Sequence, residues 1–302
     1  MITFVLSGGG NRGPLQVGAL RVLLESGIVP EMIVGSSAGA INGAFLALNP
    51  VTEQCDEMAR LWNRAGKHKL IAASPLQFVK QFARGADHIS DNQLLKRYAR
   101  ARMGDGTTTF GALKIPLFVT IGHLRTHTLY VYGDDPSADV VEAIATSSAV
   151  PGFFPPTRHK GELFIDGGSL INLPIMLAIS RGATEIYALD IAYDLRARRS
   201  FEGVLKIGEH ASRPILYSRN IEQLQKGIAT PGITIHHVPF YEFPDVNLGD
   251  FSKTDAMIAS GARDMRDYLR SPAPNRVRGM HKFGEHELPE GPAGARPFLE
   301  HA

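Results

Sequence analysis

The chain has 302 residues, of which 44% are hydrophobic and 21% are charged, and its formal net charge is +2. This composition can bury a full core as one domain and excludes disorder throughout. The near-neutral charge gives no reason to expect a nucleic acid partner. The single cysteine, Cys55, excludes an internal disulfide and is compatible with a reducing compartment.

The N-terminal residues predict a strand and not a targeting segment. MITFVL has no basic region and no apolar run of the kind that opens a signal peptide. No window approaches the roughly 18 uncharged apolar residues that a membrane span requires. We therefore expect a soluble, cytoplasmic protein.

The predicted elements alternate between strands and helices. Residues 2–6 are a β-rich run that ends at a glycine cluster, and apolar residues at helical spacing follow as far as Gly27. Residues 31–37 predict a second strand, and 38–48 a helix of small residues suited to packing on a sheet. Further strands are predicted at 117–122, 128–133, 162–166, 185–192 and 233–240, and helices at 139–149, 174–182 and 254–269. This order predicts an α/β fold.

Two stretches differ in composition from the rest. Residues 271–302 mix Pro, Gly and charge with almost no apolar periodicity, which predicts a flexible tail after a domain spanning 1–270. Residues 60–102 carry ten Lys or Arg, opposed within the stretch only by Asp87 and Asp91. This basic segment is either a solvated helical face or a surface that contacts an anionic membrane.

The glycine cluster after the first strand, GGGNRG at 8–13, satisfies the dinucleotide pattern G-x-G-x-x-G. In that interpretation an acidic residue ends the second strand and binds the ribose. Here the second strand ends in Gly-Ser-Ser, and the nearest acid, Glu31, precedes the strand. The sequence therefore disfavours a nucleotide cofactor.

The end of the second strand carries Gly35-Ser36-Ser37-Ala38-Gly39, a G-x-S-x-G pentapeptide between a strand and a helix. This is the context of a nucleophile elbow, in which glycines at both ends relieve crowding at a sharp turn. The hydroxyl of Ser37 would lie at the N-terminus of the following helix, where the helix dipole favours developing negative charge. We predict that Ser37 is a nucleophile and that Gly35 and Gly39 form its turn.

An ester hydrolase also needs donors for the oxyanion. The backbone amides of Gly8, Gly9 and Gly10 could supply them because these residues have no side chains, and Arg12 adds positive charge nearby. Turns after neighbouring parallel strands open on one edge of a sheet. We therefore expect both glycine-rich turns to converge on one crevice.

The candidate base is Asp166, which follows a predicted strand and precedes Gly167 and Gly168. A carboxylate in that turn could take the serine proton directly, although Asp and Gly are also ordinary turn formers. The downstream histidines lie in no acid-then-histidine setting, and we expect them to be structural or solvated. They include His210, His236, His237, His281 and His286.

With these motifs in hand, the chain resembles the patatin-like phospholipases, in which four motifs follow one another in a fixed order. The four are present here as GGGNRG at 8–13, GSSAG at 35–39, ATSSAVPGFFPP at 145–156 and DGGSLINLP at 166–174. The resemblance covers roughly residues 3–195. It implies a three-layer α/β/α fold around a mainly parallel sheet, a Ser37–Asp166 dyad, an oxyanion hole at residues 8–12, and no metal or organic cofactor.

The implied function is release of fatty acid from phospholipids or related lipid esters. An acyl chain needs an apolar groove, for which residues 70–103 with Phe153 and Phe154 are candidates. Two alternatives remain open: an esterase or thioesterase acting on soluble acyl esters, and a catalytically silent lipid-binding relative. The sequence leaves the oligomeric state, head group and acyl position open.

Overall fold

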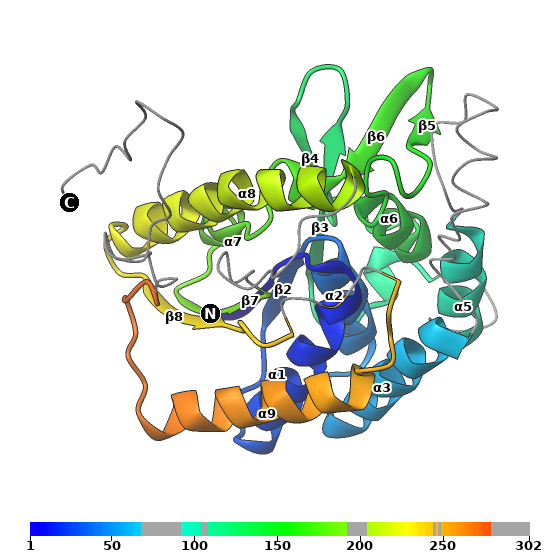
Figure 1. Cartoon of the computed structure of the whole chain (residues 1–302). Helices are drawn as coiled ribbons and strands as arrows, with labels where there is room; N and C mark the ends of the chain where they lie inside the picture. The colour runs from blue at the N-terminus through cyan, green and yellow to red at the C-terminus, as the bar shows by residue number, and fades with distance from the viewer. Residues whose placement is uncertain (68–91, 104–107, 192–203, 244–245, 247–248, 279–302) are drawn as a thin grey trace, which may run out of the picture.

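The computed structural model describes residues 1–67, 92–103, 108–191, 204–243, 246 and 249–278, with the side chains of Lys67 and of residues 204–213 left aside (Figure 1). Within these residues one mixed sheet forms the centre of the molecule. Its hydrogen-bonded order is β5-β6-β3-β2-β1-β7-β8, and β4 pairs with β3. The strands are β1 (Ile2–Leu6), β2 (Met32–Gly35), β3 (Leu117–His123), β4 (Leu129–Tyr132), β5 (Thr157–His159), β6 (Glu162–Asp166), β7 (Glu185–Asp190) and β8 (Thr234–Pro239).

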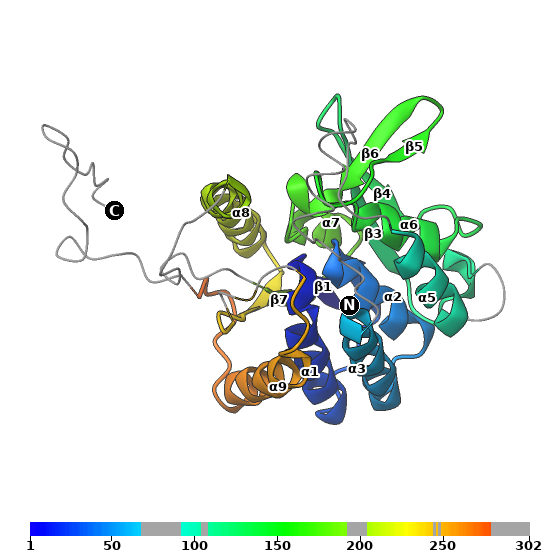
Figure 2. The ribbon, with the colours of Figure 1, turned by 45° about the vertical axis from the view of Figure 1, so that its right-hand side comes forward.

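Helices cover both faces of the sheet, as Figures 1 and 2 show. Side chains of α7 and α8 join one apolar cluster with Val5 and Val34, while most other helices pack on the opposite face around Phe4 and Leu6. The helices are α1 (Gly13–Glu25), α2 (Ala38–Leu48), α3 (Thr52–Lys67), α5 (Gln93–Met103), α6 (Val140–Ser147), α7 (Ile175–Ser180), α8 (Val204–Ile228) and α9 (Thr254–Arg270). The predicted three-layer α/β/α fold is confirmed.

The sheet changes direction at β3, and this change positions the site. Strands β3, β2, β1, β7 and β8 are parallel, whereas β4 and β6 both run antiparallel to β3. Val119 of β3 pairs with Gly35 and with Tyr132, and Ile121 pairs with Asp166 and with Tyr130. Since a strand has only two edges, β2 and β6 must share one edge of β3, opposite β4.

Strands β2 and β6 therefore meet end to end. β2 finishes at Gly35 opposite Val119, and β6 arrives from the other direction and finishes at Asp166 opposite Ile121. The turns that follow them, with Ser37 on one side and Gly167 on the other, share the space between the two strand ends. In this way Ser37 and Asp166, which lie 129 positions apart in the sequence (166 minus 37), are brought together.

The segment after α9 lies along the edge strand β8. Asn275 accepts a hydrogen bond from the Ile235 amide through its side chain, and the Asn275 amide donates to the Ile235 carbonyl, both at 2.8 Å. The Arg278 amide donates to Nδ1 of His237. Residues 271–278, the first part of the predicted tail, thus cover the edge of the sheet, and the remainder of the tail lies outside the described residues.

Within the described part of the chain, no helix combines the length and the apolar character needed to cross a bilayer.

Candidate active site

The turn between β2 and α2 holds Ser37 in a left-handed backbone conformation, with φ of 53° and ψ of −121°. This region costs a residue with a side chain about 1–3 kcal/mol, so the surrounding structure must enforce it. Gly39 permits the turn because a Cβ there would lie 2.1 Å from the Leu6 carbonyl oxygen, and at Gly35 it would lie 2.7 Å from the Gly39 oxygen. The geometry is that of the predicted nucleophile elbow.

A serine of the neighbouring motif holds this turn in place. The Ser37 amide donates a 2.9 Å hydrogen bond to Oγ of Ser147, which is fully buried at the end of α6. The carbonyl of Ser37 accepts from the amides of Ala40 and Ile41 in the first turn of α2. Ser147 therefore anchors the backbone of the candidate nucleophile.

Asp166 faces this turn from the end of β6 and is almost fully buried. Its Oδ1 accepts a 2.7 Å hydrogen bond from the Gly168 amide, and its own amide donates to the Ala149 carbonyl. Burial raises the pKa of the Asp166 carboxyl to about 7, although hydrogen bonds from the Ser37 side chain and the Gly168 amide lower it. The structure thus brings Ser37 and Asp166 together, with a carboxyl whose proton affinity suits a base near neutral pH.

Asn172 connects the turn after Asp166 to the first glycine-rich turn. Its Oδ1 accepts from the Gly8 amide at 3.0 Å, and its Nδ2 donates to the Gly8 carbonyl at 3.2 Å. A Cβ at Gly168 would lie 2.8 Å from the same Oδ1, so the turn has room only for glycine there. Sequence reasoning missed Asn172, although it stands six residues after the candidate base in the DGGSLINLP block.

The predicted oxyanion residues occupy different places. The Gly8 amide is bonded to Asn172, and the guanidinium of Arg12 is buried and donates to the carbonyls of Phe240 and Glu242. Gly10, with φ of 58°, lines the same cavity as Ser37. Gly10 therefore lies at the cavity beside Ser37, and Gly9 precedes it in the same turn, while Gly8 and Arg12 fix the loop.

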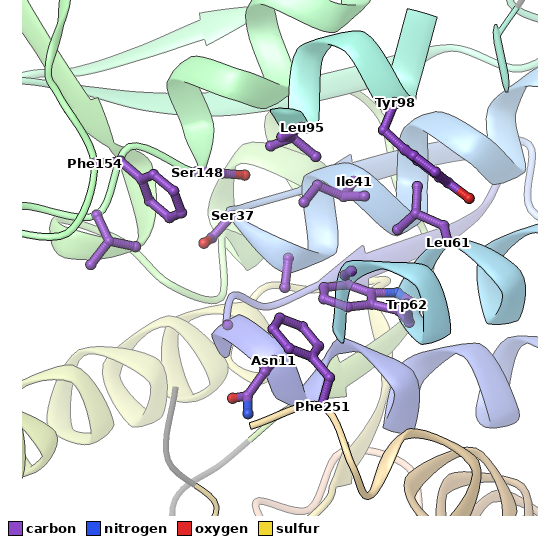
Figure 3. A pocket seen from close by; sticks show the side chains of 14 residues that line it. Asn11, Ser37, Ile41, Leu61, Trp62, Leu95, Tyr98, Ser148, Phe154 and Phe251 are labelled. Atoms are coloured by element: carbon purple, nitrogen blue, oxygen red, sulfur yellow. The ribbon is translucent and has the colours of Figure 1, made fainter. Parts of the chain in front are cut away.

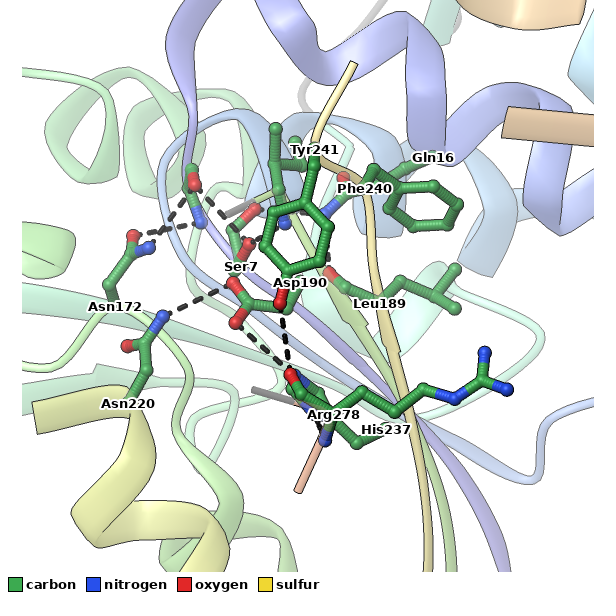
Figure 4. A network of polar contacts seen from close by, with 12 residues as sticks. Ser7, Gln16, Asn172, Leu189, Asp190, Asn220, His237, Phe240, Tyr241 and Arg278 are labelled. Carbon is green, nitrogen blue, oxygen red and sulfur yellow. Dashed lines mark hydrogen bonds and ion pairs between the residues drawn. The ribbon is translucent and has the colours of Figure 1, made fainter. Parts of the chain in front are cut away.

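A polar network at the ends of β1 and β7 supports the first glycine-rich turn (Figure 4). Oγ of Ser7 accepts from the Ile191 amide at 2.7 Å, and the Gln16 side chain donates to the carbonyls of Ser7 and Leu189. Asp190, at the end of β7, contacts the side chains of Asn220 and His237. These bonds join the ends of β1 and β7 and fix the position from which the glycines leave the sheet.

The cavity at Ser37 is lined mostly by apolar side chains (Figure 3). Helices α2, α3 and α5 supply most of its wall, with the loop before β5 and Phe251. Its lining includes Gly10, Ser37, Ile41, Leu61, Trp62, Ala65, Leu95, Tyr98, Ser148, Val150, Phe154 and Phe251. Of the predicted groove, Leu95, Tyr98 and Phe154 line it, Phe153 lies outside this lining, and residues 70–91 lie outside the described part of the chain.

The described histidines of the sequence analysis have structural partners. His236 is stacked on Tyr187 at 4.3 Å between ring centroids, its Nδ1 bonds to the Tyr268 hydroxyl, and burial lowers its pKa. His237 lies between Asp190 and the Arg278 amide. Neither contacts Ser37, and the side chain of His210 and residues 281 and 286 lie outside the described residues.

Acids from other segments pair with the described cations of the basic segment. Arg102 and Arg60 both contact Glu57, and Lys96 and Arg100 both contact Glu142. These carboxylates lie outside residues 60–102 in the sequence, so composition alone did not reveal the pairing. The local positive charge of this segment is correspondingly smaller than its residue count indicates.

Fold and site together define an α/β protein in which a strand-to-helix turn holds a serine beside a buried carboxyl, an arrangement typical of serine ester hydrolases. The chain belongs to the patatin-like phospholipase family: the model described as "Patatin-like phospholipase" matches residues 4–179, and the family is one of carboxylic ester hydrolases.

The names of curated relatives contain either the same family name or a related activity. "Patatin-like phospholipase domain-containing protein 7" of Rattus norvegicus is 30% identical over 194 residues, covering 63% of this chain and 13% of the relative. "Lysophospholipase NTE1" of Mycosarcoma maydis is 28% identical over 198 residues, covering 63% of this chain and 10% of the relative. The chain thus spans about an eighth or less of the length of these two proteins.

Among solved structures, VipD from Legionella pneumophila is similar over 89% of this chain and 66% of that one, with a TM-score of 0.49 and 15% identity.

Proposed function

We propose that this chain hydrolyses carboxylic esters of lipids, with Ser37 as nucleophile and Asp166 as general base. One observation carries the proposal: a serine held at positive φ, close enough to a buried carboxyl to influence its pKa, at the wall of an apolar cavity. Each part answers one requirement of ester hydrolysis, namely a nucleophile at the cavity wall, a base of suitable pKa and a place for an acyl chain.

Acylation starts when Oγ of Ser37 attacks the carbonyl carbon of the ester and Asp166 accepts the hydroxyl proton. The amides of Gly9 and Gly10, which have no hydrogen-bond partner among the described residues, donate to the oxyanion of the tetrahedral intermediate. The N-terminus of α2 adds a favourable dipole. The bond to the leaving alcohol then breaks, Asp166 passes its proton to that alcohol, and the acyl group stays on Ser37.

Deacylation repeats these steps with water. Asp166 takes a proton from a water molecule, whose oxygen attacks the acyl carbon, and the same amides hold the second oxyanion. Collapse of this intermediate breaks the bond to Ser37, which recovers its proton from Asp166. The products are a fatty acid and the free alcohol, and the enzyme returns to its starting state.

The cavity favours a lipid over a small soluble ester as the natural substrate. Its walls are aliphatic and aromatic, so a hydrocarbon chain gains about 0.8 kcal/mol for each CH₂ group that it buries there. A short soluble ester leaves most of this surface unused. Phospholipids and lysophospholipids both present such chains next to an ester carbonyl, so we propose this substrate class.

Fatty acid release from phosphatidylcholine and lysophosphatidylcholine, compared with hydrolysis of a short soluble ester, tests this assignment. We expect a higher kcat/KM for the long-chain lipids, and no release by Ser37→Ala. Equal kcat/KM for short and long acyl chains would assign the site to soluble esters instead. A folded wild-type protein without turnover on any of them would favour the silent lipid-binding alternative.

Membrane contact through the basic 60–102 segment was the partner prediction of the sequence analysis. In the described part of that segment, Arg97 is an exposed cation on α5, and Arg64 contacts the hydroxyl of Tyr98. We propose that, among the cations of this segment whose side chains the structure describes, these two supply the attraction for anionic lipid, since Arg60, Lys96, Arg100 and Arg102 are paired with acids.

A further inference from the structure

Two hairpins beside the site form an antiparallel arm that projects beyond the helical layers (Figures 1 and 2). Strand β6 pairs with both β5 and β3, and β3 pairs with β4, so the four strands follow the order β5-β6-β3-β4. The Leu124 amide also donates to the Leu163 carbonyl, which extends this pairing beyond the end of β3. We call residues 123–130 and 157–164 the arm.

The arm starts at the candidate active site. Val150 and Phe154 line the cavity, and only Pro155 and Pro156 separate Phe154 from the first residue of β5. On the return path, β6 ends at Asp166 itself. A surface that contacts the arm is therefore brought close to the cavity.

The tip of the arm carries positive charge. By sequence, the arm contains three Lys or Arg and one carboxylate, Glu162, which is a formal net charge of +2 with its histidines neutral (3 minus 1), and Lys160 is its exposed lysine. Arg125 contacts Glu162, and the pair lies at the surface. His159 and Lys160 are exposed at the β5–β6 turn.

The β5–β6 turn presents Lys160 in a defined direction. His159 pairs with Glu162, so Lys160 and Gly161 alone connect the two strands, and both have positive φ, at 48° and 85°. This is the backbone of a type I′ turn, which matches the twist of the flanking strands. Lys160 is thus held at the end of the arm by a tight turn.

Exposed apolar groups accompany the charge. Tyr130 is 47% exposed and Leu124 is 38% exposed. The ring of Tyr130 packs edge to face on Phe164, with 5.4 Å between centroids, and Phe164 in turn contacts the ring of His123 at 5.1 Å. A half-exposed tyrosine whose ring is held by aromatic packing, beside basic residues, is the composition of a surface that lies at a membrane interface.

From these observations we infer that the arm docks on an anionic phospholipid surface and brings the cavity to its lipid substrate. The cations match the negative charge of the lipid head groups, and Tyr130 and Leu124 enter the interface beneath them. Among the described residues, the arm is the principal membrane contact, rather than Arg60, Lys96, Arg100 and Arg102, which are paired with acids. The role of this contact in bringing the cavity to a lipid substrate rests on the proposed function, whereas vesicle binding is measured independently of that function.

The test compares two variants with the same change in net charge. Lys160→Glu reverses a cation at the tip of the arm, and Arg97→Glu reverses an exposed cation of the basic segment. Binding of the full chain to sedimented vesicles of phosphatidylcholine, with and without phosphatidylserine, is measured together with hydrolysis of a short soluble ester. Leu124→Ser tests the apolar part in the same assay.

We expect the wild type to sediment with the phosphatidylserine vesicles only. Lys160→Glu should lower this partitioning by about tenfold or more, since each basic residue near such a surface contributes about fivefold and reversal adds repulsion. Arg97→Glu should change it by less than about threefold. Leu124→Ser should weaken binding by a few-fold, and the three variants should keep the soluble-ester activity of the wild type.

Three results would overturn the inference: wild-type protein that ignores both kinds of vesicle, equal losses in Lys160→Glu and Arg97→Glu, or a loss confined to Arg97→Glu. If light scattering without vesicles shows a dimer that Lys160→Glu dissociates, the arm joins two copies of the chain instead. Failure of the proposed function gives a different result: the wild type then shows either no preference for long-chain lipids or no ester hydrolysis at all, while its vesicle binding is unchanged.

Discussion

The two sides of the cavity at Ser37 are built by different means. On one side, buried polar groups at the strand ends fix one another by hydrogen bonds: Asn172 to Gly8, Ser147 to Ser37, and Gly168 to Asp166. On the other side, helices α2, α3 and α5 supply an apolar wall. We propose a division of work from this difference, in which the polar side carries the chemistry and the apolar wall selects the acyl chain.

The largest effect should come from the nucleophile. Ser37→Ala removes the atom that forms the acyl-enzyme, so ester hydrolysis should fall by about 10⁴-fold or more, while the fold is kept because the Ser37 side chain is small. Steady-state kinetics on a long-chain and a short-chain ester measure this loss. Loss on one ester only would contradict a single nucleophile for both.

Asp166→Asn should cost about 10²- to 10⁴-fold, the range expected for a general base. In the wild type, activity should rise as the pH increases through about 7, because the carboxyl must lose its proton to act as base. A pH profile of kcat/KM checks this. A profile that is already flat from pH 5 to 8 would show that Asp166 does not titrate in the catalytic step.

The same carboxyl should make stability depend on pH. Its pKa of about 7 in the folded protein exceeds the ordinary value of about 3.9 in an unfolded chain, so the folded state binds more protons between these values. The free energy of unfolding should therefore fall as the pH rises through this window, by at most about 4 kcal/mol.

Asp166→Asn cannot ionise and should be more stable than the wild type at pH 8, with little difference at pH 4. Urea denaturation of both proteins at the two pH values measures this. A variant that is equally destabilised at pH 8 and pH 4 would contradict the buried, proton-binding carboxyl.

Asn172→Ala should lower kcat by about 10- to 100-fold with little change in KM, because Gly8 loses both of its hydrogen bonds to Asn172 and the oxyanion donors move. Asn172→Asp is the matched control, since it still accepts from the Gly8 amide but cannot donate to the Gly8 carbonyl. It should fall between the wild type and Asn172→Ala. A purely structural Asn172 would lower stability in both variants and leave kcat of the folded protein unchanged.

The smallest effect should come from the apolar wall. The Trp62 indole donates to Oδ1 of Asn42, and a Cβ at Gly13 would lie 2.2 Å from its ring, so the wall is backed by tightly packed protein. Trp62→Phe should shift the preferred acyl chain length upward and change kcat/KM by a few-fold at either end of a chain-length series.

The same substitution should lower stability by about 1–3 kcal/mol, since Asn42 loses a buried donor. Ile41→Phe, which adds volume elsewhere in the same apolar wall, should shift the preference toward shorter chains. If either variant lowers turnover equally for every chain length, the proposed division of work between the two sides of the cavity does not hold.

Local patterns predicted most of the fold and both candidate catalytic residues. The strand at residues 2–6 and the elbow at 35–39 are properties of short segments, and the structure has them at the predicted places. Helix α8 was not predicted, because Pro214 interrupts it and the apolar side chains of its described half form only a weak stripe.

The meeting of Ser37 with Asp166 depends on non-local pairing. It follows from two strands that approach β3 from opposite directions along one edge, and no short window of sequence contains that information. The same limit hid the pairing of Lys96 and Arg100 with Glu142 of α6. Sequence reasoning placed the parts of the site, whereas tertiary structure decided which charges remained available.

The most direct test of the central claim is covalent labelling of the full chain with a fluorophosphonate, with the adduct located by mass spectrometry. We predict a single adduct on Ser37 that forms faster as the pH rises through 7, is absent in Ser37→Ala and forms slowly in Asp166→Asn. An adduct on another serine, or labelling of Ser37 at the same rate in folded Asp166→Asn, would contradict the proposed dyad.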